Sequence, residues 1–129
     1  MTGPAAFETW SPEQLAELEA NRENGRVGSQ LVSETDDLRV WHLNLAPGVR
    51  FGFHTHVLDY FWTALSAGRG RQHYGDGAVR EVTYAAGDTK HSRFAAGERM
   101  HHDLENIGDT DLVFVTVEFK RSPNQPLPL

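Results

Sequence analysis

Short stretches of alternating apolar and polar residues fill the chain after Gly25 and predict β-strands. The predicted strands are residues 30–33, 41–45, 51–56, 60–65, 71–74, 79–84, 101–105 and 112–119. Each stretch stops at turn residues, and Gly75-Asp76-Gly77 is a strong signal for a hairpin. Short strands with turns about every 8–12 residues are typical of a β-sandwich or barrel. We therefore expect a nearly all-β fold.

One segment before these strands has the pattern of a short amphipathic helix, at about residues 12–23. Its start carries a capping residue, a proline in the first turn and a partner that completes a capping box, namely Ser11, Pro12 and Gln14. Leu15 and Leu18 form a narrow apolar stripe, and Asn24-Gly25 predicts the end of the helix. The helix is expected to pack against the rest of the domain.

Apolar residues occupy both faces of the last predicted strand. One face is formed by Val113, Val115, Val117 and Phe119, and the other by Leu112 and Phe114. A strand that is apolar on both faces is buried on both. Either the helix covers one face or a second copy of the chain does, and we expect a homodimer.

The length of 129 residues indicates a single domain. We divide it into an N-terminal segment with the helix (1–25), a β-barrel (26–120) and an extended tail (121–129) that could lie along a neighbour. The N-terminus shows no basic stretch followed by an apolar run, so no signal peptide is expected. No apolar segment approaches the roughly 20 residues that a membrane span needs.

The composition narrows the partners that the chain is expected to bind. There is no cysteine, which excludes thiolate ligands and thiol nucleophiles and favours a reducing, cytoplasmic location. A net charge of -6 without a Lys/Arg run argues against nucleic acid and anionic membranes. A small-molecule substrate is the partner that we expect.

Seven histidines are the unusual feature of the composition. His54 and His56 stand two apart on a predicted strand, so both side chains point to the same face. Inward-facing imidazoles are costly unless something pairs with them, and a divalent cation does so. A later strand can supply a third imidazole, because strands far apart in sequence converge inside a barrel. His101 and His102 point to opposite faces, so only one of them looks inward.

Two ordered motifs in this pattern resemble those of the cupin superfamily. The first runs from Gly48 through His54-x-His56 to Gly68, and the second runs through Gly87-Asp88, Gly97, His102 and Asn106. The resemblance covers about residues 38–120 and implies a double-stranded β-helix, or jelly-roll barrel, with a metal between its sheets. It also implies His54, His56 and His102 as the metal ligands, because the His-x3-Asn spacing favours His102 over its neighbour.

The chain departs from the cupin pattern in two places. Many cupins add a glutamate ligand before the glycine that closes the first motif, and Phe61 holds that place here. Asp59 is the alternative oxygen ligand, and its other role is that of a turn residue. The stretch from Gly87 to His102 is longer than usual and lacks the customary proline, which leaves the strand register of residues 90–101 open.

The missing glutamate indicates a class of chemistry. Three neutral imidazoles leave a metal ion its full charge and open positions for a chelating anion and for dioxygen. Resemblance to three-histidine cupin dioxygenases implies a non-haem Fe2+ enzyme acting on a small organic acid or ketone, with Zn2+, Ni2+ or Mn2+ as alternatives. A metal-dependent lyase or isomerase and a non-catalytic module that binds a small ligand or metal are the other readings.

Several polar residues are candidates for roles beside the metal. Gln72 and Tyr74 would face the interior and could hydrogen-bond a substrate oxygen, and Tyr60 could act as an acid or an orienting phenol. Three cations could gather at the barrel mouth and attract a carboxylate, although solvated loop positions are the favoured interpretation for Lys90, Arg93 and Arg99. The histidines not expected to be ligands are His42, His73 and His91.

Overall fold

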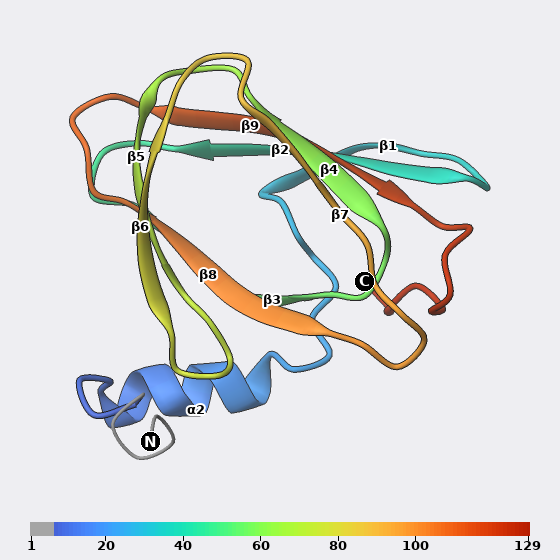
Figure 1. The fold of residues 1–129 in the computed structure, drawn as a ribbon, viewed down its shortest axis with the longest axis horizontal. Coiled ribbons are helices and arrows are strands. Elements are labelled where there is room, and N and C mark those ends of the chain that lie inside the picture. Colours follow the sequence, from blue (N-terminus) through green and yellow to red (C-terminus); the bar gives the residue numbers. More distant parts are fainter. Residues whose placement is uncertain (1–6) are drawn as a thin grey trace.

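Two antiparallel β-sheets face each other in the computed structural model, which describes residues 7–129 (Figure 1). The first sheet has the order β1-β2-β9-β4-β7 and the second has the order β3-β8-β5-β6. The strands are β1 (Gln30–Glu34), β2 (Leu38–Leu45), β3 (Arg50–His56), β4 (Tyr60–Ala64), β5 (Gly68–His73), β6 (Val79–Tyr84), β7 (Thr89–Ser92), β8 (Met100–Asn106) and β9 (Leu112–Phe119). This arrangement confirms the predicted all-β double-stranded β-helix.

The main core lies between the two sheets, because alternate residues of each strand point inward. It consists of Leu43, Leu45, Ala64, Tyr84, Leu104, Leu112 and Phe114, which come from five strands. Four of them, Leu43, Tyr84, Leu104 and Phe114, also line the cavity. The histidines and the cavity described below lie beside this apolar core.

The hairpin predicted at Gly75-Asp76-Gly77 joins β5 to β6. Its backbone is closed by a 2.8 Å hydrogen bond from the Tyr74 amide to the Ala78 carbonyl. Gly77 has a φ of 90°, a conformation that residues with a Cβ rarely adopt. The glycine therefore allows the turn.

Strand β7 is the one element that the sequence pattern does not predict. Its residues, Thr89 to Ser92, are all polar. The segment becomes a strand because it pairs along β4, with Tyr60 opposite Ser92 and Trp62 opposite Lys90. This pairing fixes the register that the sequence leaves open.

Helix α2 (Pro12–Ala20) starts with the predicted capping box. It ends three residues before the predicted stop, because the Asn21 side chain and backbone amide both bond to the Glu17 carbonyl. The helix lies on the outer side of the sheet that contains β3 and β8 (Figure 1). There Leu18 packs with Trp10 and Phe53.

The helix does not cover the outer face of β9, so that alternative for the two-sided apolar strand is wrong. Val113, Val115 and Val117 are half-buried on this face, while Leu112 and Phe114 point into the core. The C-terminal tail packs on its own chain: Leu127 is buried against Val57 and Leu58. Within residues 7–129, no helix is long and apolar enough to cross a lipid bilayer.

Candidate metal centre

Three histidines from neighbouring strands converge inside the molecule. His54 and His56 lie on β3, and His102 lies on β8 directly opposite His54. One ring nitrogen of each residue lies within 4.8 Å of those of the other two. His54 and His56 are buried, and His102 is half-buried beside a cavity. The sequence therefore identified the three side chains that the fold brings together.

A β-bulge in β3 turns the histidines inward. Phe51 pairs with Leu104, but the next regular pair is His54 with His102, so β3 carries one extra residue between the two pairs. Without that residue, strict alternation would put Phe51 and Phe53 on one face and His54 on the other. With it, Phe51 packs on the inner core while Phe53 packs under the helix.

Hydrogen bonds hold two of the imidazole rings in the tautomer that a metal ligand needs. His54 donates from Nδ1 to the Gly52 carbonyl at 2.9 Å, and His102 donates from Nδ1 to Oε1 of Gln72 at 2.9 Å. The proton on Nδ1 leaves the Nε2 lone pair free in each ring. Both lone pairs are thus available to a cation.

His56 is held in a different way. Its Nε2 lies 3.1 Å from Nε2 of His102, and its buried Nδ1 has no hydrogen-bond partner within residues 7–129. The ring instead stacks on Tyr60, with 4.1 Å between the ring centroids. Tyr60 therefore positions His56 by stacking.

Burial keeps the three rings neutral. Desolvation lowers the pKa of His54 to about 4 and lowers the pKa values of His56 and His102 well below the usual range. Neutral imidazoles carry the lone pairs that bind divalent iron, zinc, nickel or copper. A 3.1 Å hydrogen bond joins Nε2 of His56 to Nε2 of His102, and a cation bound by both rings would replace it. The three residues fit a single divalent ion.

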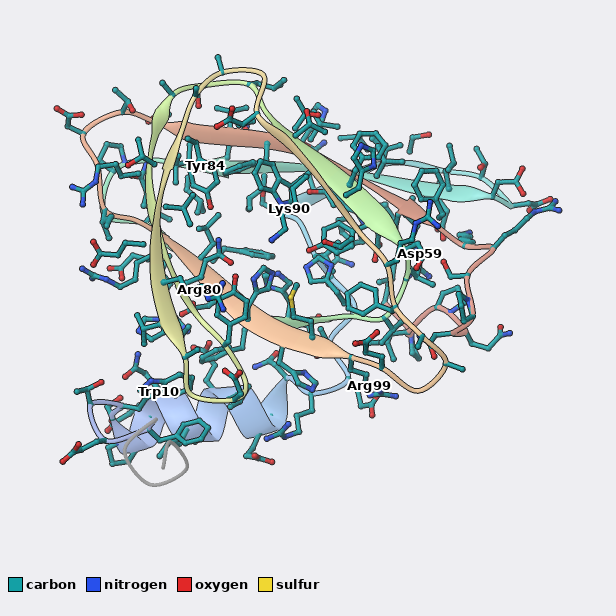
Figure 2. The ribbon with its side chains drawn as sticks, in the orientation of Figure 1. Trp10, Asp59, Arg80, Tyr84, Lys90 and Arg99 are labelled. Atoms are coloured by element: carbon teal, nitrogen blue, oxygen red, sulfur yellow. The ribbon has the colours of Figure 1, made fainter. Side chains whose placement is uncertain are left out.

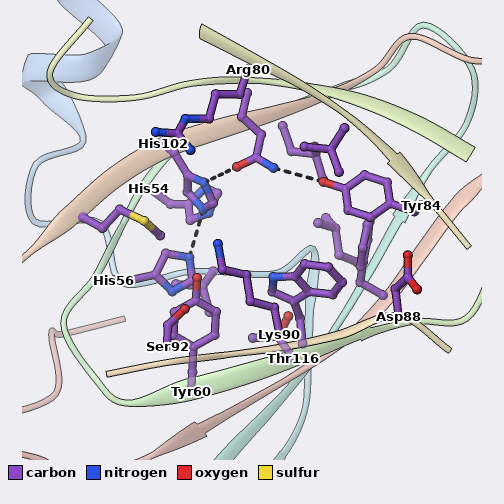
Figure 3. Close-up of a pocket in the computed structure, with 18 of the residues that line it drawn as sticks. His54, His56, Tyr60, Arg80, Tyr84, Asp88, Lys90, Ser92, His102 and Thr116 are labelled. Carbon is purple, nitrogen blue, oxygen red and sulfur yellow. Dashed lines mark hydrogen bonds between the residues drawn. The ribbon is translucent and has the colours of Figure 1, made fainter. Parts of the chain in front are cut away.

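A cavity of about 500 Å³ opens beside the histidines (Figure 3). Gln72 organises its polar wall, because its Oε1 accepts from the Tyr74 hydroxyl at 2.6 Å and its Nε2 donates to the Tyr84 hydroxyl at 3.0 Å. Burial raises the pKa of Tyr74, and it raises that of Tyr84 to about 12. Both phenols are therefore neutral in ordinary buffers, and Gln72 and Tyr74 reach the cavity as the alternation predicts.

Asp59 does not reach the three histidines. Its carboxylate accepts a 2.9 Å hydrogen bond from the Phe94 amide, and Figure 2 places it away from the interior. Tyr60, rather than Phe61, holds the inward position beside His56. Phe61 faces outward, where its ring lies 5.3 Å from that of His91. A glutamate in place of Phe61 would therefore point away from the centre.

The remaining histidines lie outside the cluster, as expected. His101 bonds to the Thr55 hydroxyl on the helix side of the sheet, at 2.7 Å. His73 bonds to the buried carboxylate of Asp103. His91 packs on the outer face, and His42 is exposed.

Arg80 and Tyr84 are among the residues of the cavity that were not predicted. The sequence pattern could have identified them, because alternation along residues 79–84 places Arg80 and Tyr84 on one face with Val82. Of the three cations proposed for the barrel mouth, only Lys90 lines the cavity. Arg99 instead pairs with Glu23 at 2.7 Å.

The chain has the fold of the cupins, a double-stranded β-helix, and it carries three inward histidines on the strands that hold the two motifs. No family model matches it. In sequence it is 34% identical over 77 residues to the oxalate decarboxylase OxdC of Bacillus subtilis, a stretch that covers 58% of this chain and 19% of that protein. The chain thus spans about a fifth of the length of this relative.

Solved structures show the same fold. A cupin domain from Bordetella pertussis superimposes with a TM-score of 0.62 at 22% identity, over 70% of this chain and 90% of that one. A double-stranded β-helix protein from Klebsiella pneumoniae is 31% identical with a TM-score of 0.53, over 67% of this chain and 66% of that one. The first likeness concerns the fold alone, whereas the second extends to the sequence.

Proposed function

We propose that this cupin is a metalloenzyme that binds a small organic acid or ketone at a divalent ion held by His54, His56 and His102. The observation that carries the proposal is the convergence of three neutral imidazoles, within 4.8 Å, beside a cavity of about 500 Å³. A bound ion supplies Lewis acidity and coordination positions for oxygen donors.

Iron and a dioxygen-dependent cleavage are the preferred assignment. No carboxylate joins the histidine group within the described residues, so the ligand set adds no negative charge to the ion. Such a set favours an anionic substrate and leaves room for dioxygen. In the proposed reaction one carbon–carbon bond breaks, and both atoms of O2 enter the products.

The protein's own residues have separate roles in this proposal. Gln72 orients His102, while the Tyr74 hydroxyl, already donating to Gln72, is placed to turn toward a substrate oxygen. Tyr60 fixes the plane of His56, and burial raises the pKa of its phenol. Tyr60 and Tyr74 are the groups to which we assign proton transfer to the substrate.

A second candidate is a redox-neutral decarboxylation, and the similarity to oxalate decarboxylase favours it. In this reaction the bond to a carboxylate breaks, CO2 leaves and a proton takes its place. Zinc, nickel or manganese would serve this role without any change of oxidation state. It belongs to the lyase alternative that the sequence leaves open.

Elemental analysis of purified protein tests the proposal first. We expect close to one equivalent of iron in the unaltered chain, loss of that iron in His56→Ala, and retention in His42→Ala, which removes an exposed histidine. Absence of metal under every loading condition would overturn the metalloenzyme.

Activity then separates the two reactions. Oxygen uptake with dicarbonyl, thiol or hydroxy-acid compounds supports the dioxygenase, and CO2 release without oxygen uptake supports the decarboxylase. A metal-loaded protein that does neither would be the non-catalytic binding module. A homodimeric assembly and a cytoplasmic location complete the proposal.

A further inference from the structure

The cavity opens between the free edges of the two sheets. Strand β6 is the last strand of one sheet and β7 is the last strand of the other, and residues of both line the cavity. Alternation turns Arg80, Val82 and Tyr84 of β6 inward, and Lys90 and Ser92 of β7 inward. Two cationic side chains, Arg80 and Lys90, therefore flank the opening from opposite sheets.

Lys90 reaches toward the histidines. Figure 3 shows its ammonium group extending into the cavity in front of His56 and His102, and Figure 2 shows the side chain between the sheets. Arg80 lies at the other rim, with its guanidinium carbon 5.7 Å from the centre of the Tyr74 ring.

Neither cation is neutralised by the protein. Within the described part of the chain, the ion pairs include neither Arg80 nor Lys90. Asp88 is the acidic residue that lines the cavity, and its carboxylate accepts from the Ala85 amide in the turn before β7. Neutral imidazoles and two cations leave the cavity positively charged, and a divalent ion makes it more so.

We propose that Lys90 and Arg80 are the substrate-binding cations of this cavity, and that the substrate is a small carboxylate with an apolar body. The inference rests on the proposed function, and it narrows the organic acid or ketone to the acid. A carboxylate between the histidine centre and Lys90 balances both charges at once. Arg80 attracts the anion at the entrance and contacts its outer oxygen.

The groups that surround the cavity favour a carboxylate over a phosphate as the bound anion. Phosphate sites are commonly built from a helix N-terminus or a nest of backbone amides. The helix α2 lies on the outer side of the sheet, away from the cavity. Apolar side chains also line the cavity, among them Trp62, Val82 and Phe114, which suits a branched or cyclic hydrocarbon body.

Calorimetric titration of the metal-loaded, full-length chain tests this inference with two probes. The probes are 4-methyl-2-oxopentanoate and its neutral amide, which differ in charge but have the same hydrocarbon body. We expect the acid to bind at least about tenfold more tightly than the amide. Lys90→Met should remove about tenfold of the affinity for the acid and leave that for the amide unchanged, because methionine keeps the apolar stem.

Further variants test whether the position of a cation, and not only the net charge of the protein, determines the affinity for the acid. Arg93→Gln removes one exposed cation three residues from Lys90 that does not line this cavity, and its affinity for the acid should equal that of the unaltered chain. Arg80→Gln should lower the affinity for the acid by a smaller factor, about threefold. Equal binding of acid and amide, an unaffected Lys90→Met, or inorganic phosphate competing as strongly as the acid would each overturn the inference.

The same titration on chelator-treated protein distinguishes this inference from the proposed function. If no metal binds at all, the metalloenzyme fails, but the preference for acid over amide and its dependence on Lys90 should persist at lower affinity. A second outcome is also decisive. If Lys90→Met and the unaltered chain bind metal equally well, and neither prefers the acid over the amide, the proposed metal site is supported and the proposed role of Lys90 is wrong.

Discussion

Gln72 on β5 accepts a 2.9 Å hydrogen bond from Nδ1 of His102 on β8. The bond fixes the tautomer of His102, and loss of such a partner typically costs about 10–100-fold in metal affinity. We therefore expect Gln72→Ala to weaken iron binding by about this factor and to lower the free energy of unfolding by about 1–2 kcal/mol. Competition with a chromophoric chelator measures the affinity.

Gln72→Glu provides the matching rescue. Its carboxylate still accepts from His102 and Tyr74 but cannot donate to the Tyr84 hydroxyl. Metal affinity should return close to that of the unaltered chain, while Gln30→Ala, on an exposed position of β1, should change nothing. Equal metal affinity in Gln72→Ala and the unaltered chain would show that this bond does not position His102.

Glu118 on β9 makes the stability depend on pH. Its buried carboxylate accepts a 2.7 Å hydrogen bond from Nε1 of Trp41 and lies opposite Tyr60 on β4. Burial raises its pKa to about 7, from 4.5; the Trp41 bond and the charge of Arg39 oppose this rise, and Glu34 adds to it. Between these two values the folded protein holds more protons than the unfolded chain, so its stability falls as pH rises.

Glu118→Gln tests this relationship, because glutamine keeps an oxygen for Trp41 and cannot ionise. Relative to the unaltered chain, the variant should gain about 2.5 kcal/mol in unfolding free energy between pH 5 and pH 8. Urea unfolding at pH 5, 6.5 and 8 measures the difference, with the exposed substitution Glu81→Gln as the control. Parallel pH profiles for Glu118→Gln and the unaltered chain would contradict the prediction.

The sequence predicts most of the fold because short-range patterns determine it. Turn residues mark the strand ends, and the hairpin at Gly75-Asp76-Gly77 closes as predicted. Strand β7 is not predicted, because its residues show no alternating apolar pattern. It forms a strand through its pairing with β4. The earlier helix end depends on one side chain, Asn21, bonding back to the helix.

The candidate metal centre is likewise predicted only in part. The spacing of His54 and His56 predicts their common face, and the second motif predicts His102. The bulge before His54, which decides that this face is the inner one, depends on the pairing of β3 with β8 and has no local signature. The inward direction of Lys90 likewise follows from the register of β7, and the sequence leaves that register open.

The helix is held to the barrel through Glu17. Its carboxylate accepts two hydrogen bonds from Arg50, at 2.7 and 2.9 Å, and one from the Phe53 amide at 2.9 Å. The Nε of Arg50 also donates a 2.7 Å hydrogen bond to the fully buried carboxylate of Asp103. Because Glu17 is part-exposed, we expect Glu17→Gln to lower the unfolding free energy by about 1–2 kcal/mol.

Hydrogen exchange provides a local measurement of the same contact. The Phe53 amide should exchange faster in Glu17→Gln, since its acceptor becomes a weaker, neutral oxygen. Glu19→Gln, on the same helix, breaks only an exposed pair with Arg22 and should leave both stability and exchange unchanged. Equal effects of the two substitutions would indicate that the Glu17 contacts do not anchor the helix.

The outer face of β9 is expected to pair with a second copy of the chain. Val113, Val115 and Val117 are only half-buried there, and within the described residues the helix packs elsewhere. Sedimentation of the unaltered chain should give about twice its mass of 14.4 kDa, and Val115→Asp should sediment as a monomer because a buried carboxylate at the interface is costly. Val79→Asp, which adds the same charge at an exposed position of β6, should remain dimeric. A monomer for the unaltered chain at tens of micromolar would contradict the assembly and leave this face open to solvent.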